Sequence, residues 1–334
     1  MAYYLPFGYT HKTMPIIHLP EANRPQVLMQ ADRERGLLDL DPTQIIDLYK
    51  QHGALLLRGF GADIAQFPAF ARRFCPTSVI NNSLGRRPID AAAKIQTVNC
   101  GTLAFSLHPE LSREPWKPDA ALFACFSPPS RGGATTICDG VALVRALPEA
   151  LRSALAPRRL LYKMECWPEL LEFWLGDPKP SDALLAAPPS TCPYFFRRSG
   201  EQVVRMFTRP VLHKPMFIDE PAFGNFLLFA RFSKNLPNFP VLDDGSPVPE
   251  TWLQTIKAVG DSLTVPVVWE AGDVLMLDNT RFMHGRTTIL DARERLIATF
   301  FGYVSFALPN PEEPAQPRWR QADFTPPLRP GLQR

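Results

Sequence analysis

The feature that most restricts the fold of this chain is its proline content, because 36 of its 334 residues are proline. Proline lacks a backbone N–H and its ring clashes with the preceding helical turn, so it interrupts helices and is rare in central strands. A chain so rich in proline is not built from long helices. We expect short elements joined by many turns and by rigid connections.

Short apolar segments bounded by turn residues predict β-strands. They are residues 54–59, 120–126, 273–278 and 295–306. The last of these is the longest, and β-branched and aromatic residues occur throughout it. These segments indicate a protein with a substantial β-sheet core.

Apolar residues at helical spacing lie between the expected strands and predict helices at residues 41–50, 62–74, 140–156 and 250–263. Asp41 is placed to cap the first of them. No GxGxxG follows a strand and no GxxxxGK[ST] occurs, which argues against a dinucleotide-binding sheet and a phosphate-binding loop. A β-sandwich or jelly roll decorated with helices fits this order best.

Charge and cysteine usage exclude several classes of protein. Lys and Arg number 36 against 33 acidic residues, a balance too even to predict binding to nucleic acid or to an anionic membrane. The apolar runs are shorter than the roughly 18 residues of a membrane span, and the first residues do not form a secretion signal. The six cysteines form no CxxC pair. We therefore expect a soluble cytoplasmic protein with reduced thiols.

One arrangement of residues indicates a metal site. His108 and Glu110 form an HxE pair, and on an extended segment residues two apart point the same way. His284 follows the predicted strand at 273–278 much later in the chain. Two histidines and one carboxylate on one face form the ligand set of non-haem iron oxygenases. The pair alone is a weak signal and is more typical of a surface loop, and the HExxH motif of zinc proteases is absent.

The surroundings of these residues make the pattern more specific. His108-Pro109-Glu110 precedes the stretch SPPSRGGAT, which ends at Thr135, and the segment WEAGD leads to His284. Arg295 lies 11 positions after His284, and Thr135 lies 25 positions after Glu110. In order and spacing the chain resembles the TauD/TfdA family of Fe(II)/2-oxoglutarate-dependent dioxygenases from about residue 53 to residue 306. Its Glu ligand and its PP…GG…T stretch are similar to the SyrP-like branch.

The resemblance implies a fold and a domain organisation. We expect a mostly β protein with added helices, built on a double-stranded β-helix of the jelly-roll, cupin-like type. The single oxygenase domain would span residues 1–334, with its core at about 53–306 and a helical insert at about 140–265. Residues 307–334 would form a tail rich in Pro and Arg.

The resemblance also implies the cofactors and the site. Fe(II) would be held by His108, Glu110 and His284, and the cosubstrates would be 2-oxoglutarate and O2. Thr135 and Arg295 would bind 2-oxoglutarate; Arg293 competes for this role, because residues two apart on a strand share a face. A guanidinium suits it because it offers paired donors to a carboxylate.

The expected reaction is hydroxylation of an aliphatic carbon of an amino acid or a related small carboxylate in secondary metabolism. The substrate would be a small molecule, either free or tethered to a carrier protein. Arg113 and Trp116 are candidates for binding its carboxylate and its apolar part, and an exposed loop is the alternative for both. Desaturation, cyclisation or epimerisation on the same centre remain open, as does a non-catalytic jelly roll that binds a small molecule. Asn99 and Asn279 lie near the ligands in sequence without an assigned role.

Overall fold

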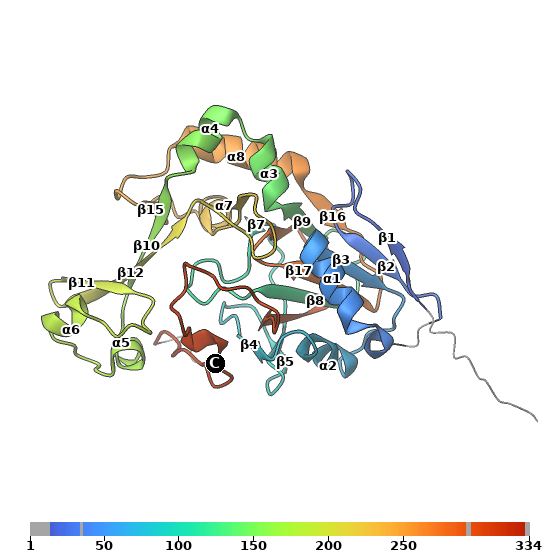
Figure 1. Ribbon diagram of the computed structural model, residues 1–334, viewed down its shortest axis with the longest axis horizontal. Helices are drawn as coiled ribbons and strands as arrows, with labels where there is room; N and C mark the ends of the chain where they lie inside the picture. Colours follow the sequence, from blue (N-terminus) through green and yellow to red (C-terminus); the bar gives the residue numbers. More distant parts are fainter. Residues whose placement is uncertain (1–13, 34–35, 292–294, 331–334) are drawn as a thin grey trace, which may run out of the picture.

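The computed structural model describes residues 14–33, 36–291 and 295–330, and it is built around two β-sheets (Figure 1). Within these residues the larger sheet has nine strands, and all its pairings are antiparallel except that of β2 with β3. Its strand order is β1 (Ile16–His18), β2 (Val27–Gln30), β3 (Ala54–Arg58), β17 (Asp273–Asp278), β8 (Ala120–Ser127), β19 (Leu296–Tyr303), β6 (Ile95–Thr97) and β5 (Pro88–Asp90), with β4 (Thr77–Ser78) also pairing with β19.

The centre of the larger sheet is buried on both faces, which explains why its strands read as continuous apolar runs. In β3, Leu56 faces the second sheet, whereas Leu55 and Leu57 face the opposite side, as the alternation of side chains along a strand requires. Helices α1 (Pro42–His52) and α2 (Gln66–Arg72) cover that opposite side.

The smaller sheet has the order β16 (Val265–Val267), β9 (Thr135–Asp139), β18 (Phe282–Arg286) and β7 (Phe105–His108). Residues from both sheets meet in one apolar cluster, for example Phe123 of β8 and Ile137 of β9. The two sheets thus face each other across a shared core. This arrangement confirms the predicted jelly roll with added helices.

Most predicted helices are present, with one informative difference. Asp41 caps α1 by accepting a hydrogen bond from the amide of Thr43 at 3.0 Å, and α8 (Glu250–Leu263) has the predicted bounds. The helix predicted at 140–156 is instead two helices, α3 (Gly140–Ala146) and α4 (Glu149–Leu155). Leu147 is extended because it precedes Pro148, whose ring disfavours the helical conformation of the residue before it.

The segment 140–265 contains helices, as expected, together with a sheet that the sequence pattern did not indicate. That sheet has the order β11 (Phe195–Ser199), β12 (Gln202–Pro210), β10 (Arg159–Glu165) and β15 (Val241–Leu242), and a separate ribbon pairs β13 (Leu212–His213) with β14 (Ala222–Phe223). The remaining helices of the segment are α5 (Pro168–Leu175), α6 (Asp182–Ala186) and α7 (Leu227–Phe232). Figure 1 shows β11, α5 and α6 on the side away from the N-terminal strands. The segment therefore contains both helices and strands, whereas the sequence had predicted a helical insert.

The C-terminal tail packs onto this framework. It contains a short 3-10 helix, Arg318–Arg320, whose Trp319 is fully buried, as is Phe324 nearby. Arg320 makes two hydrogen bonds to the Asp119 carboxylate, at 2.7 and 2.9 Å. A second 3-10 helix, Leu37–Asp39, precedes α1. In the described part of the chain, no helix combines the length and the apolar character that crossing a membrane requires.

Candidate metal centre and its pocket

Two histidines from distant parts of the sequence are brought together by strand pairing. β7 and β18 are adjacent antiparallel strands, and His108 and His284 are partners in their register. Side chains of directly opposed residues project from the same face of a sheet. The two imidazole rings accordingly lie with their centroids 4.5 Å apart, between the two sheets, where His284 also contacts the ring of Phe123.

Both imidazoles are suited to metal binding because they are neutral. Burial lowers the pKa of His108, and burial together with the neighbouring His108 lowers the pKa of His284. Nδ1 of His108 lies 2.8 Å from the carbonyl oxygen of Ser106 and donates to it, so the lone pair is on Nε2. Such a hydrogen bond to the distal nitrogen is the usual device for orienting a ligating histidine.

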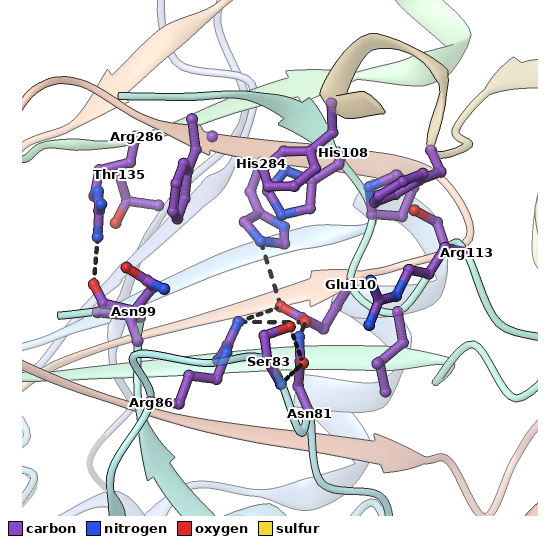
Figure 2. Close-up of a pocket in the computed structure, with 18 of the residues that line it drawn as sticks. Asn81, Ser83, Arg86, Asn99, His108, Glu110, Arg113, Thr135, His284 and Arg286 are labelled. Atoms are coloured by element: carbon purple, nitrogen blue, oxygen red, sulfur yellow. Dashed lines mark hydrogen bonds and ion pairs between the residues drawn. The ribbon is translucent and has the colours of Figure 1, made fainter. Parts of the chain in front are cut away.

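Glu110 completes the cluster from the turn that follows β7. Its Oε2 lies 3.6 Å from Nε2 of His284, and one ligand atom from each of His108, Glu110 and His284 lies within 4.8 Å of the others (Figure 2). Asn279, in the turn between β17 and β18, fixes the backbone of Glu110 through two hydrogen bonds. The structure therefore brings the three predicted ligands together.

The donor set fits a divalent iron ion. Two neutral imidazoles and one carboxylate supply three ligand atoms, and an ion held by such a set would keep positions for further ligands. All three residues line a cavity of about 310 Å³. The rings of Phe105 and Phe229 form an apolar part of its wall, and Phe229 lies 4.2 Å from the His108 ring.

The two residues predicted to bind the cosubstrate line the same cavity. Thr135 begins β9 and is buried, and its hydroxyl accepts a hydrogen bond from the indole N–H of Trp269 at 3.1 Å. Arg295 precedes β19; burial lowers the pKa of its guanidinium to about 10, and its Nε has no hydrogen-bond partner. A half-buried guanidinium with an unpartnered donor suits a carboxylate ligand. The competing residue, Arg293, lies outside the described residues.

Two residues that the sequence did not indicate hold the carboxylate of Glu110. Arg86 donates from one terminal nitrogen to both oxygens, at 3.1 and 3.3 Å, and the amide of Asn81 donates to Oε1. Asn81 is itself held by Ser83, whose backbone N–H donates to the Asn81 Oδ1 at 2.8 Å. Figure 2 shows Arg86 and Asn81 approaching Glu110 from the same side.

Arg286 lines the pocket and holds a neighbouring loop in place. Its guanidinium donates to the carbonyl oxygens of Asn99, Gly101 and Leu103 and lies over the Phe105 ring at 4.3 Å. The Asn99 amide in turn donates to the Leu84 carbonyl at 2.8 Å. These bonds tie the loop at 99–103 to β18 and to the loop that carries Arg86.

The two candidate substrate residues lie in different surroundings. Arg113 lines the cavity; its side chain is 48% exposed, and its Nε is 3.6 Å from a Glu114 oxygen. Trp116 is buried in an aromatic cluster and stacks on Trp174 at 6.1 Å. Trp116 does not line the cavity, so of the two only Arg113 is positioned to contact a bound molecule.

Comparison with known proteins agrees with this geometry. The family model described as "Taurine catabolism dioxygenase TauD, TfdA family" matches residues 29–299. No sequence among the curated proteins matches this chain significantly.

Solved structures with the same fold include three named proteins. PvcB, an Fe, alpha-ketoglutarate dependent oxygenase from an isonitrile synthetic pathway, is 15% identical with a TM-score of 0.58, and the match covers 93% of this chain and 98% of PvcB. A taurine dioxygenase from Burkholderia xenovorans has the same identity and TM-score, with 87% and 90% covered. AAD-2, in complex with Mn(II) and N-oxalylglycine, is 14% identical with a TM-score of 0.53, with 89% and 100% covered.

Proposed function

Because this chain belongs to the TauD/TfdA family of Fe(II)- and 2-oxoglutarate-dependent dioxygenases, we propose that it hydroxylates an aliphatic carbon of a small carboxylate, most specifically an amino acid. The substrate is free or tethered to a carrier protein, and the reaction belongs to secondary metabolism, in the manner of the SyrP-like branch. The whole chain acts as a single oxygenase domain. A cytoplasmic location is part of the proposal, supported by six cysteines that are all unpaired thiols.

The observation that carries the proposal is the buried His108–Glu110–His284 cluster opening into a cavity lined by basic and apolar side chains. In the proposal these three residues hold Fe(II), which supplies the activation of O2. Arg295 and Thr135 bind the carboxylate of 2-oxoglutarate that lies away from the metal. Phe105 and Phe229 exclude water and contact the apolar part of the substrate.

The overall reaction consumes one molecule each of O2, 2-oxoglutarate and substrate. 2-Oxoglutarate loses CO2 and becomes succinate, which takes one oxygen atom, while the other oxygen enters a C–H bond of the substrate to give an alcohol. The protein determines which C–H bond reacts by orienting the bound substrate. Arg113, at the rim of the cavity, is placed to attract the carboxylate of an approaching substrate.

The test is succinate release, together with product mass, across a panel of free and carrier-bound amino acids. Coupled turnover with an added mass of one oxygen atom is the expected result. Turnover with loss of two hydrogens and no added oxygen would instead identify a desaturase or cyclase on the same centre. Turnover only with a sulfonate, an aryloxyacetate or a terpenoid would overturn the amino-acid substrate. No succinate release with any compound would favour a non-catalytic binding protein.

A further inference from the structure

The cavity next to the candidate metal centre carries more positive than negative charge. Among the described residues that line it, the only acidic side chain is Glu110, whereas five are basic: Arg86, Arg113, Lys234, Arg286 and Arg295. A divalent ion, the Glu110 carboxylate, dianionic 2-oxoglutarate and the Arg295 guanidinium together have no net charge. Any further buried cation in this pocket therefore calls for a further anion.

Three of the five basic residues that line the cavity do not require a further anion. Arg286 directs its guanidinium to backbone carbonyl groups and is part of the wall. Arg113 and Lys234 are exposed, and water screens charges in such positions. Only Arg86 remains as a buried cation without a role in binding 2-oxoglutarate.

Arg86 is buried, with 8% of its side chain exposed, and its present anionic partner is Glu110. One terminal nitrogen contacts the Glu110 carboxylate, and the other makes a long hydrogen bond of 3.4 Å to the Thr299 hydroxyl. Its Nε is buried and has no partner. The guanidinium lies 5.2 Å from the centre of the Phe301 ring. Arg86 thus has unused donors, and the one carboxylate that it contacts is also the proposed metal ligand.

We propose that Arg86 is the specificity-determining residue that binds the carboxylate of the substrate; this rests on the proposed function. When Glu110 shares its charge with a metal ion, Arg86 is left short of negative charge, and a substrate carboxylate supplies it. A guanidinium can hold such a group through two parallel hydrogen bonds. Because Arg86 contacts Glu110 directly, a carboxylate bound to it lies beside the metal ligands and brings its own carbon chain next to them.

The same argument predicts discrimination against neutral analogues. A carboxamide has the shape of a carboxylate but leaves the buried guanidinium without a counter-charge, so the pocket should reject it. Sites built around a buried polar partner reject analogues that lack the matching group far more strongly than apolar sites do. The ratio of carboxylate to carboxamide binding is therefore the quantity that Arg86 should control.

The experiment uses the full chain loaded with Mn(II) and N-oxalylglycine, and it measures how strongly the bound Mn(II) relaxes the protons of small probes. The probes are three matched pairs: isobutyrate and isobutyramide, hexanoate and hexanamide, and L-leucine and L-leucinamide. Relaxation in the Zn(II)-loaded protein is subtracted. We expect each carboxylate to be relaxed at least fivefold more than its amide in the wild-type protein. Arg86→Met should remove this preference, Arg86→Lys should keep part of it, and the adjacent exposed Arg87→Met should keep all of it.

Controls separate this role from support of the metal ligand. Mn(II) binding to each variant is measured from the spin-resonance signal of the free ion. If Arg86→Met binds Mn(II) poorly, a reduced preference for carboxylates in Arg86→Lys decides whether Arg86 controls that preference. Equal relaxation of acids and amides in the wild-type protein overturns the proposal, as does an undiminished preference in Arg86→Met. A preference that disappears in Arg113→Met but not in Arg86→Met transfers the role to Arg113. If isobutyrate and hexanoate show the preference and L-leucine does not, the amino-acid substrate fails while the role of Arg86 stands.

Discussion

Asn279 binds both backbone groups of Glu110. Its Oδ1 accepts from the Glu110 amide at 2.7 Å, and its Nδ2 donates to the Glu110 carbonyl at 3.1 Å and to the Pro118 carbonyl at 2.8 Å. The same side chain thus joins the turn after β7 to the turn before β18. Since those turns adjoin His108 and His284, Asn279 sets the spacing of the proposed ligands without being one of them.

Asn279→Ala should destabilise the fold and weaken metal binding. The side chain is almost fully buried, so its removal leaves an amide and two carbonyl groups without partners, at a cost of roughly 2 to 4 kcal/mol. Urea unfolding and Mn(II) titration measure the two effects. The exposed Asn238→Ala should change the free energy of unfolding by less than about 0.5 kcal/mol. Unchanged Mn(II) affinity in Asn279→Ala would contradict the positioning role.

The three proposed ligands should each be required for the iron complex. Anaerobic addition of Fe(II) and 2-oxoglutarate to the wild-type protein should give a weak visible charge-transfer band. His108→Ala, Glu110→Ala and His284→Ala should each abolish it, because each removes one of only three protein ligands. His18→Ala, on the exposed face of β1, is the matched control. Retention of the band in all three variants would show that the metal binds elsewhere.

Loss of the Arg295 guanidinium should weaken cosubstrate binding more than loss of the Thr135 hydroxyl. Arg295→Ala should reduce 2-oxoglutarate affinity by about 2 to 5 kcal/mol, the scale for removing one side of a buried charge pair. Thr135→Ala should cost on the order of 1 kcal/mol. Calorimetric titration of the Mn(II)-loaded protein measures both. A larger loss of 2-oxoglutarate affinity in Arg293→Ala than in Arg295→Ala would assign the binding of 2-oxoglutarate to Arg293 instead.

The stability of the fold should fall in mild acid because of His213. Its Nε2 donates to the Thr280 carbonyl at 2.6 Å, and burial, then the nearby Lys117, lowers its pKa to about 3. The unfolded chain takes up a proton near pH 6.5 and the folded chain does not, so this residue's contribution is present above pH 6.5 and is lost as the pH falls from 6.5 toward 3. Between pH 7.5 and pH 5.0, the wild-type protein should lose roughly 1 to 2 kcal/mol more than His213→Gln in urea unfolding. His18→Gln should behave as the wild type, and equal losses in all three proteins would contradict the assignment.

The parts of the fold that were predictable from sequence are those determined by local patterns. The strand β17 and the helix α1 follow from an apolar run and from a capped amphipathic segment. The break at Leu147–Pro148 was missed because the apolar spacing continues through it, although the proline prevents one continuous helix. The sheet formed by β10, β11 and β12 was missed because its residues show no clear alternation in sequence.

The candidate site divides in the same way. His108, Glu110 and His284 could be found because their chemistry and spacing form a pattern. Arg86 and Asn81 could not, because they reach Glu110 from an irregular loop, and nothing in their sequence neighbourhood predicts the contact. Trp116 follows Glu110 closely in sequence, yet the chain turns there, and its ring packs into the core. Proximity along the chain is a poor guide to contact once the chain leaves a regular element.

The ion pair between Arg320 and Asp119 makes the C-terminal tail part of the cooperative fold. The Asp119 carboxylate also accepts a hydrogen bond from the backbone N–H of Val304. The Asp119 backbone carbonyl accepts one from the backbone N–H of Asn279, at 2.8 Å. Asp119 is buried, so without Arg320 its carboxylate would lose the cation that pairs with it. The tail should therefore unfold together with the strands around Asp119 and not fray independently of them.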